Sequence, residues 1–139
     1  MKIRKATKKD FKRIATIYEE EMFRQFKLIK EKPISAKKYV VILKNNLRKS
    51  KMFVLEDTKI KGFIWWLKEN DEFNLEEIFI TEKNRGYGKI LMDFMKKQAK
   101  KEKIKKINLD VHFKNKKAQK FFEKMGFTKR TIEMSIDLK

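Results

Sequence analysis

The chain has 139 residues, of which 38 are Lys or Arg and 19 are Asp or Glu, so its net charge is +19 at pH 7. A chain of this length usually forms one domain, and we expect residues 1–139 to be a single domain. The sequence contains no Cys, which excludes disulfide bonds, thiolate metal ligands and a Cys nucleophile. It has no apolar run of about 18 residues and begins without the apolar segment of a secretion signal. We therefore expect a cytoplasmic protein that does not enter a membrane.

The positive charge has two interpretations that composition does not separate. An excess of Lys and Arg favours an anionic partner, such as nucleic acid, an acidic protein or a phosphorylated ligand. The basic residues are also spread along the whole chain, as they are in a protein with a lysine-coated surface. The single histidine, His112, cannot form a metal site by itself, and we expect no metal.

Apolar spacing predicts both strands and helices in the first 80 residues. After a short strand, Thr7 and Asp10 form a capping box, and apolar residues at helical spacing follow from Phe11. Ser35 is expected to cap a second helix, directly after Pro33. Turn residues then separate three more strands. The strands expected in this part of the chain are residues 2–6, 52–55, 60–67 and 73–80.

The remainder of the chain alternates between helices and strands. Residues 82–97, EKNRGYGKILMDFMKK, contain a glycine-rich turn and the beginning of a helix. We expect this helix to end near Lys103. A strand at 107–111, a helix at 115–125 and a strand at 127–138 follow. Hairpin-linked strands followed by strand–helix–strand units predict an α/β protein with helices on the faces of a mixed sheet.

Gly86 and Gly88 allow several interpretations. The dinucleotide-binding fingerprint G-x-G-x-x-G needs a third small residue, but Leu91 stands there. The phosphate-binding loop G-x-x-x-x-G-K-[ST] is absent. Glycines before a helix can also bring its unpaired N–H groups and positive dipole end close to a phosphate; Arg85 and Lys89 would add charge. An ordinary strand-to-helix turn would contain the same glycines.

A second pattern lies in residues 107–127, INLDVHFKNKKAQKFFEKMGF. Asn115 is a good N-cap, and Gly126 has the position of a C′ glycine. Between them an apolar stripe repeats at helical spacing. We therefore expect an amphipathic helix between two strands. The stripe consists of Ala118, Phe121, Phe122 and Met125.

Together, the two patterns resemble the GNAT superfamily of N-acetyltransferases over nearly the whole chain. The family's pyrophosphate loop, [R/Q]-x-x-G-x-[G/A] followed by a pair of large aliphatic residues, is similar to KNRGYG at 83–88 followed by Leu91 and Met92. Lys83 stands where the family has Arg or Gln; aligning Arg85 there instead would displace the glycines. The second signature is L-x-V-x-x-x-N-x-x-A-x-x-[FLI]-Y-x-x-x-G-F. It is matched by Leu109, Val111, Asn115, Ala118, Phe121, Gly126 and Phe127.

This resemblance implies a fold, a cosubstrate and a reaction. The fold would be a mixed, mostly antiparallel sheet of six to seven strands flanked by about four helices. Acetyl-CoA would lie in a cleft where strands 73–80 and 107–111 splay apart, and its acetyl group would pass directly to an amine. The residues that the resemblance assigns to binding of acetyl-CoA are Ile78, Phe79, Ile80, Lys83, Asn84, Arg85, Gly86, Tyr87, Gly88, Lys89, Asn115 and Phe122.

Phe122 departs from the family pattern. The usual residue is a Tyr that gives a proton to the leaving CoA thiolate, and Phe has no proton to give. A thiol has a pKa of about 8.5, so the thiolate is already a fair leaving group near neutral pH. Water, Tyr87 or Tyr39 could supply the proton instead.

Glu76 and Glu77 are the candidate general bases. Family members often carry a Glu on the strand before the loop, and these are the only acids on that stretch. Neighbouring strand residues point to opposite faces, so at most one of the two enters the cleft. We favour Glu77 and keep Glu76 as the alternative. His112 could also act as a base near neutral pH, and it ranks behind Glu77.

The acceptor could be a protein N-terminus, a lysine side chain or a small amine; the charge of +19 disfavours a polyamine. Two other function classes remain open. Phe122 motivates a CoA-binding module without catalysis, and the charge motivates a basic nucleic-acid-associated protein. Trp65 and Trp66 point to opposite faces of their strand. One is expected in the core, while the other could line the acceptor cleft or a homodimer contact.

Overall fold

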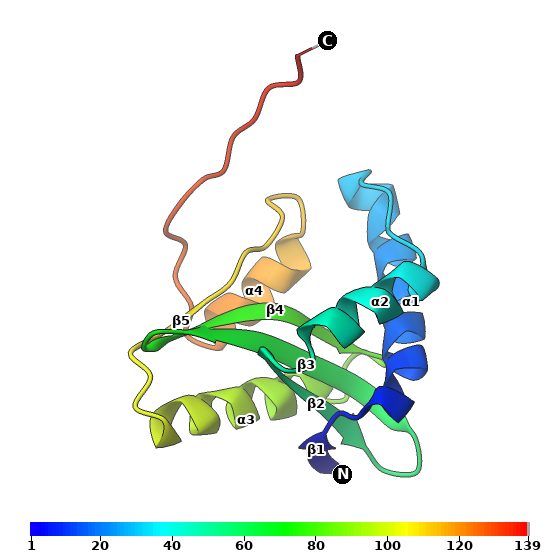
Figure 1. Ribbon diagram of the computed structural model, residues 1–139. Coiled ribbons are helices and arrows are strands. Elements are labelled where there is room, and N and C mark those ends of the chain that lie inside the picture. Colours follow the sequence, from blue (N-terminus) through cyan, green and yellow to red (C-terminus); the bar gives the residue numbers. More distant parts are fainter. Residues whose placement is uncertain (139) are drawn as a thin grey trace.

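A computed structural model describes residues 1–138. Over that range the sheet has five strands in the order β1-β2-β3-β4-β5 (Figure 1). Strands β1 to β4 are antiparallel neighbours, and β5 is parallel to β4. The strands are β1 (Lys2–Lys5), β2 (Ser50–Glu56), β3 (Ile60–Glu69), β4 (Glu72–Ile80) and β5 (Lys106–Asn108). The helices are α1 (Phe11–Ile29), α2 (Ala36–Asn46), α3 (Tyr87–Lys101) and α4 (Lys116–Lys124), with a 3-10 turn at Lys8–Asp10.

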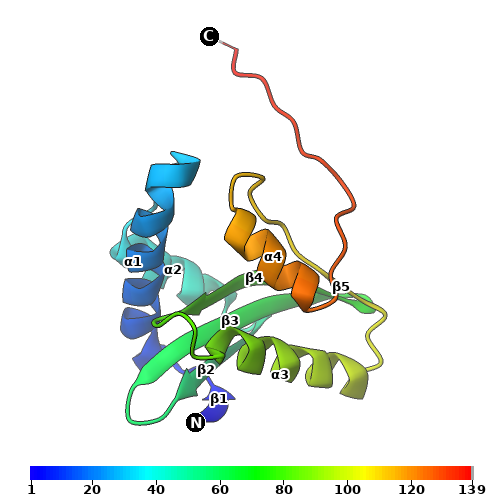
Figure 2. The same ribbon diagram turned by 180° about the vertical axis from the view of Figure 1, so that it is seen from behind.

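Helices cover both faces of this sheet. The alternation of side chains along β3 separates two cores: Phe63 and Trp65 pack with α1 and α2, whereas Ile64 and Trp66 pack with α3. The apolar side chains of α4 join the α3 core, and the helix itself lies near β4 and β5 (Figure 2). Both tryptophans are buried, so the expectation that only one of them is a core residue is wrong.

The predicted helix caps are present. The Thr7 N–H donates to the Asp10 carboxylate at 2.8 Å, and Arg4 joins that carboxylate to the Glu56 carboxylate through hydrogen bonds of 2.7–3.1 Å. The Ser35 hydroxyl accepts from Lys38 N–H at 3.2 Å at the start of α2. These contacts satisfy N–H groups that have no partner inside the helix.

Two expected strands differ from the structure. The strand expected at 107–111 is confined to Lys106–Asn108, and residues 128–138 form no strand. They leave the domain as an exposed, extended tail (Figures 1 and 2). A strand needs a neighbour to pair its N–H and C=O groups, and the tail has none within residues 1–138. Residues 1–138 therefore contain five strands, and the prediction of six to seven strands is wrong for this range.

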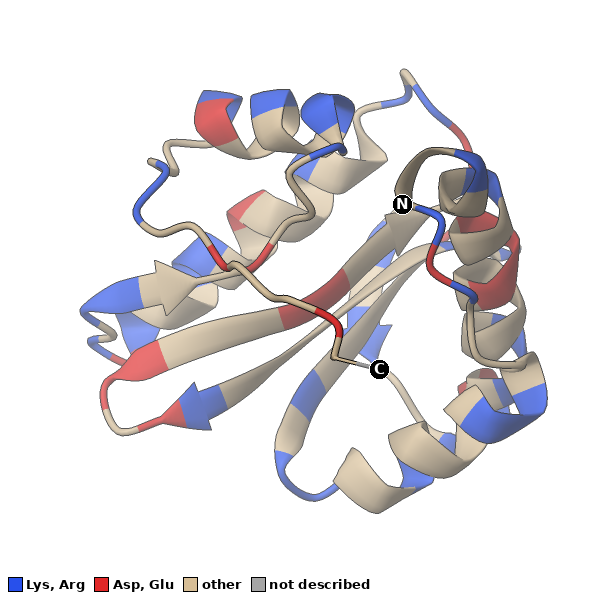
Figure 3. Ribbon diagram, turned by 90° about the horizontal axis from the view of Figure 1, so that it is seen from above, with Lys and Arg blue, Asp and Glu red and all other residues tan. Residues whose placement is uncertain are grey.

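Lys and Arg occur on all four helices and on several turns, without gathering on one element (Figure 3). This distribution agrees with a lysine-coated surface. Within residues 1–138, no helix is long and apolar enough to cross a bilayer. The same residues form no group of three or more metal-ligating side chains.

Candidate active site

Strands β4 and β5 diverge after a short parallel pairing. Asn74 opposite Asn108 is the last pair, and the Asn108 amide donates to Asn74 Oδ1 at 3.1 Å and to Glu72 Oε1 at 2.6 Å. Strand β4 continues to Ile80 paired only with β3. Its backbone groups on the β5 side are therefore open to a ligand beyond residue 74, between two parallel strands as the sequence predicts.

A β-bulge lies at the point of divergence. Trp65 is opposite Glu77 and Trp66 is opposite Leu75, which leaves Glu76 without a partner in the register. A bulge bends its strand and redirects neighbouring side chains. Here it separates the two candidate bases: Glu77 faces the α1–α2 side, while Glu76 is exposed.

The loop after β4 ends at Gly86, the N-cap of α3. Gly86 has φ +76°, a conformation that glycine adopts without strain, and a side chain there would meet nothing within 4 Å. The Ile90 N–H donates to Gly86 C=O at 3.0 Å, and no side chain caps the helix. The first-turn N–H groups of α3 thus have no side-chain acceptor within the described residues, and the space beside Gly86 is open.

Gly88 also has a role in packing. A Cβ at Gly88 would lie 3.2 Å from the Phe121 ring, so this glycine allows α4 to pack closely on α3.

The loop carries several charges with different partners. Glu82 accepts from Lys61 at 3.2 Å and lies 3.7 Å from Arg85, and Lys89 pairs with Asp93 at 2.6 Å. Lys83 is exposed and makes no ion pair with any residue in the described range 1–138. It is thus the basic side chain of the loop that is available to an anion.

Two amide side chains hold the start of α4 and the loop before it. The Asn115 Oδ1 accepts from Ala118 N–H at 3.2 Å, and this cap leaves the Asn115 amide nitrogen as a donor. Gln119 is buried, and its amide donates to the backbone C=O groups of His112 and Phe113 at 3.1 and 2.8 Å. Sequence reasoning missed Gln119, which holds the loop before α4; its place beside the apolar stripe of that helix was the available signal.

Glu77 lies in a half-buried position beside aromatic residues. Burial, with a smaller contribution from the neighbouring Glu76 charge, raises the pKa of Glu77 to about 8. The Trp65 indole N–H donates to the Tyr39 hydroxyl at 3.0 Å, and Tyr39 stacks on Tyr18 with ring centroids 3.8 Å apart. Burial and the Glu77 charge also raise the pKa of both tyrosines, so their hydroxyls stay neutral. Tyr18 was not predicted as part of this group.

Glu76 and His112 lie apart from that aromatic group. Partial burial, then the charge of Asp110, raises the pKa of Glu76. His112 Nδ1 accepts from Lys114 N–H at 3.2 Å, while its Nε2 lies 3.9 Å from the Glu31 carboxylate. His112 therefore lies near Glu31, in the segment between α1 and α2.

Phe122 is half-buried and packs edge-on against Phe121 and Phe127, with ring centroids 5.3 and 5.8 Å apart. Its ring belongs to the α3 core, as expected if this position only packs.

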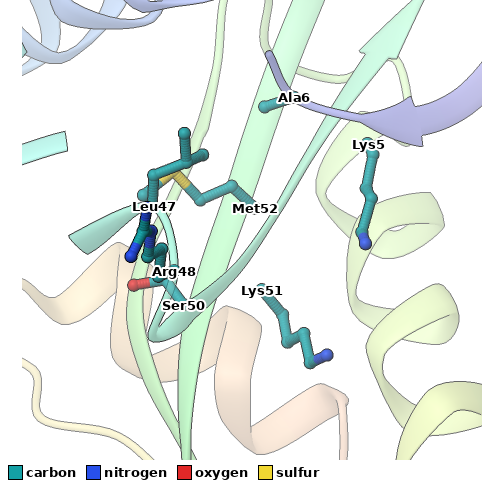
Figure 4. Close-up of a pocket in the computed structure, with 7 residues that line it drawn as sticks. All are labelled: Lys5, Ala6, Leu47, Arg48, Ser50, Lys51 and Met52. Carbon is teal, nitrogen blue, oxygen red and sulfur yellow. The ribbon is translucent and has the colours of Figure 1, made fainter. Parts of the chain in front are cut away.

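Two surface hollows lie outside the β4–β5 opening. One, of about 470 Å³, is lined by Phe23 of α1, Lys38 of α2 and the segment between these helices, which includes Pro33. The other, of about 260 Å³, lies at the β1–β2 edge and is lined by Lys5, Arg48 and other residues (Figure 4). The strand order puts this second hollow at the edge of the sheet far from β5.

Comparison with known proteins gives one family. A sequence model described as "Acetyltransferase (GNAT) family" matches residues 11–127. A search of curated protein sequences found no match.

Solved structures share the fold at low sequence identity. The PaiA N-acetyltransferase from Thermoplasma acidophilum in complex with coenzyme A has a TM-score of 0.81 at 18% identity, covering 95% of this chain and 92% of that one. An acetyltransferase from Trypanosoma brucei has a TM-score of 0.69 at 19% identity, covering 99% of each chain. A transcriptional regulator from Bacillus halodurans C-125 has a TM-score of 0.77 at 18% identity, also covering 99% of each. At these identities the structures establish the fold.

Proposed function

The chain belongs to the acetyltransferase (GNAT) family, and we propose that it is an acetyl-CoA-dependent N-acetyltransferase. In this reaction an amine nitrogen bonds to the thioester carbonyl carbon, the carbon–sulfur bond breaks, and CoA leaves as a thiolate that takes up a proton. The observation that carries the proposal is the opening between β4 and β5, which leads to the uncapped N-terminus of α3.

The residues of this opening fit acetyl-CoA. The pyrophosphate would bind to the first-turn N–H groups of α3, where Gly86 leaves open space and Lys83 adds positive charge. The pantetheine would pair with the free backbone edge of β4, and one N–H there would stabilise negative charge on the carbonyl oxygen. The Asn115 amide nitrogen would donate from the start of α4. The full proposed set is Ile78, Phe79, Ile80, Lys83, Asn84, Arg85, Gly86, Tyr87, Gly88, Lys89, Asn115 and Phe122.

We assign the general base to Glu77. An acceptor amine attacks only as the neutral form, so a group that removes its proton accelerates the reaction. A base is most effective when its pKa is near the working pH, and the pKa of Glu77 is about 8. The alternative, Glu76, is more exposed to water and lies outside the aromatic group.

Phe122 cannot donate a proton to the CoA thiolate. The Tyr39 and Tyr18 hydroxyls are neutral and lie on the same side of β4 as Glu77, so Tyr39 or water is the proposed donor. The lack of a hydroxyl at Phe122 also favours a second function, a CoA-binding module without catalysis. An N-acetyltransferase releases CoA from acetyl-CoA when a suitable amine is present, whereas a CoA-binding module releases none with any amine.

The proposed acceptor is an amine whose own net charge is negative or close to zero. With a net charge of +19, the surface repels polyamines and attracts acidic peptides. We take the hollow beside Pro33 as the acceptor site. Lys32 and Lys38 line it, so a protein N-terminus or lysine followed by acidic residues is the preferred class.

The test is a thiol-release assay with a panel of amines. Because the chain has no Cys, a thiol-reactive chromophore reports only released CoA. The panel contains acidic, neutral and basic peptides, single amino acids and spermidine, each compared with a reaction that lacks amine. We expect release above background with an acidic or neutral amine. Acetyl-CoA binding without release by any amine would favour the non-catalytic module, and a preference for spermidine would overturn the acceptor assignment.

A further inference from the structure

The hollow of about 260 Å³ at the β1–β2 edge of the sheet forms because β2 begins beyond the end of β1. The register of the two strands ends at Lys5 opposite Phe53. The Ala6 N–H still donates to the Met52 C=O at 2.9 Å, and the chain then leaves the sheet. The first residues of β2, 50–51, therefore pair only with β3.

Ser50 directs polar groups to this unpaired edge. In an antiparallel pair, the backbone groups of successive residues point alternately to the strands on either side. Since Met52 bonds toward β1, the N–H and C=O of Ser50, two residues earlier, point to the same side, where β1 no longer pairs with them. Ser50 lines the hollow and is only 8% exposed. Its covered hydroxyl makes no hydrogen bond within residues 1–138, and such a group costs stability unless a water or a ligand pairs with it.

Three basic side chains from three segments line the same hollow. They are Lys5 at the end of β1, Arg48 between α2 and β2, and Lys51 in β2. In Figure 4, Lys5 and Lys51 extend on one side of Met52 and Arg48 lies on the other. None of the three makes an ion pair within the described residues, and no carboxylate lines the hollow. Like charges around one hollow repel one another, so an anion placed there is stabilised.

The donors of this hollow match a phosphate group. An Arg guanidinium presents a fork of N–H donors that fits phosphate oxygens, and Lys adds point charges. A phosphomonoester carries a charge of about −1.5 to −2 at pH 7, which several cations balance better than they balance the single charge of a carboxylate. Between the cations the lining is apolar, with Ala6, Leu47 and Met52. Pockets for drug-sized ligands start near about 300 Å³, so this hollow fits a smaller molecule.

We propose that the hollow binds the phosphate group of a small phosphorylated molecule. Arg48, Lys5 and Lys51 hold the phosphate oxygens, and the apolar lining contacts the organic part. The Ser50 hydroxyl turns between staggered positions about χ1 and donates to one phosphate oxygen. Because β2 and β3 separate β1 from β4 in the sheet, this site is distinct from the opening between β4 and β5.

An NMR titration of the full-length, ¹⁵N-labelled chain tests the proposal, because each amide reports on its own surroundings. The probes are inorganic phosphate and phenyl phosphate, with acetate at the same ionic strength as the reference anion. The amides of Ala6, Ser50 and Lys51 report on the hollow. The amides of Gly86 and Lys89 report separately on the N-terminus of α3, so phosphate bound there is not mistaken for phosphate in the hollow.

We expect both phosphates to shift the amides of the hollow until they saturate, with phenyl phosphate binding more tightly because its ring contacts the apolar lining. Acetate should shift the same amides far less. Amides of the hollow that do not respond to phosphate, or that respond equally to acetate, would overturn the proposal. Weaker binding of phenyl phosphate than of inorganic phosphate would overturn the assignment to a phosphorylated organic molecule.

A matched pair of variants separates a built site from the general charge of the surface. Arg48→Gln removes a cation that lines the hollow and should weaken phosphate binding at least about tenfold. Lys49→Gln removes the same charge from the next residue, which is exposed and does not line the hollow, and should weaken it less than about twofold. Arg48 also follows the C-terminus of α2, where a cation stabilises a helix, so circular dichroism checks the fold of both variants. Equal weakening by the two substitutions would contradict a specific site.

Ser50→Ala tests the hydroxyl by itself. Replacing a covered, unpaired hydroxyl leaves stability in the absence of phosphate unchanged or raises it. Phosphate binding at the hollow should nevertheless weaken about tenfold, because a hydrogen bond to a charged group is lost. Thermal unfolding with and without phosphate measures the first effect, and the NMR titration measures the second. A Ser50→Ala protein that is less stable without phosphate, yet binds phosphate as the wild type does, would show that the hydroxyl is structural and would overturn its role here.

Discussion

Glu77 lies directly opposite Trp65 in the register of β3 and β4. The bulge at Glu76 makes this pairing, because it shifts the register by one residue. The Trp65 indole is in turn bonded to Tyr39 at 3.0 Å. One local irregularity of β4 thus places a carboxyl group beside a buried aromatic layer at the point where the sheet opens.

The first prediction concerns the pH dependence of catalysis. Glu77 must be deprotonated to act as a base, so kcat/KM should rise with pH and level off above about 8, the pKa of its carboxyl group. Glu77→Gln should lower kcat/KM by about 10²–10⁴ and remove that rise. Glu76→Gln is the matched control and should change the rate only slightly. A Glu77→Gln enzyme with the rate and pH profile of the wild type would exclude this base.

The second prediction concerns the leaving group. Phe122→Tyr introduces a hydroxyl at the position that resembles the family's proton donor, so kcat should rise, by up to about 10². Protonation matters most below the pKa of a thiol, about 8.5, and the gain should therefore be larger at pH 7 than at pH 9. Phe121→Tyr on the neighbouring residue is the control. An unchanged or lower kcat in folded Phe122→Tyr would show that the thiolate needs no donor from this position.

The third prediction concerns the buried hydroxyl of Tyr39, whose side chain is 3% exposed. Tyr39→Phe removes the acceptor of the Trp65 N–H, and an unpaired buried donor costs about 1–3 kcal/mol of unfolding free energy. Urea unfolding followed by tryptophan fluorescence measures the change. Tyr87→Phe, at a half-buried position, should change stability by less than about 0.5 kcal/mol. Equal stability of Tyr39→Phe and the wild type would mean that the Trp65 N–H finds another partner.

The fourth prediction concerns acid stability. The hydrogen bonds from Arg4 hold the pKa of Asp10 below its usual value, so this carboxylate stabilises the folded state above its unfolded pKa of about 3.9. That contribution is lost as the pH falls through the lower folded pKa. Asp10→Asn should reduce the unfolding free energy at pH 7 by about 1–3 kcal/mol, and the difference from the wild type should shrink below pH about 4.

The control for this effect is Asp93→Asn, which removes the exposed Lys89–Asp93 pair and should cost less than about 0.5 kcal/mol. A difference between Asp10→Asn and the wild type that does not change between pH 7 and pH 3 would contradict the assigned role of the Asp10 charge.

The sequence predicts local features of this fold well. The caps at Ser35 and Asn115 are confirmed, because capping depends on residues a few positions apart. Likewise, the two motif-bearing helices start where their glycine and asparagine signals place them. The parallel neighbours β4 and β5 also agree with the prediction.

Features that depend on distant contacts could not be predicted in the same way. The bulge at Glu76 follows from the pairing of β3 with β4, which no spacing within β4 reveals. The contact of Gly88 with Phe121 depends on how α3 and α4 pack. Alternation at 131–138 does predict a strand, but a strand also requires a neighbour, and the single chain supplies none within residues 1–138.

The most direct test of the proposed function is a calorimetric titration of acetyl-CoA against the wild type and Gly86→Glu. The matched control is Gly126→Glu, because Gly126 also has a positive φ (+102°) and open space around it, so both variants place the same side chain at a positive φ. We expect the wild type and Gly126→Glu to bind acetyl-CoA, and Gly86→Glu, which places a carboxylate at the α3 N-terminus, to lose binding. Equal binding by Gly86→Glu and the wild type, or no binding by the wild type, would contradict an acetyl-CoA site at this loop.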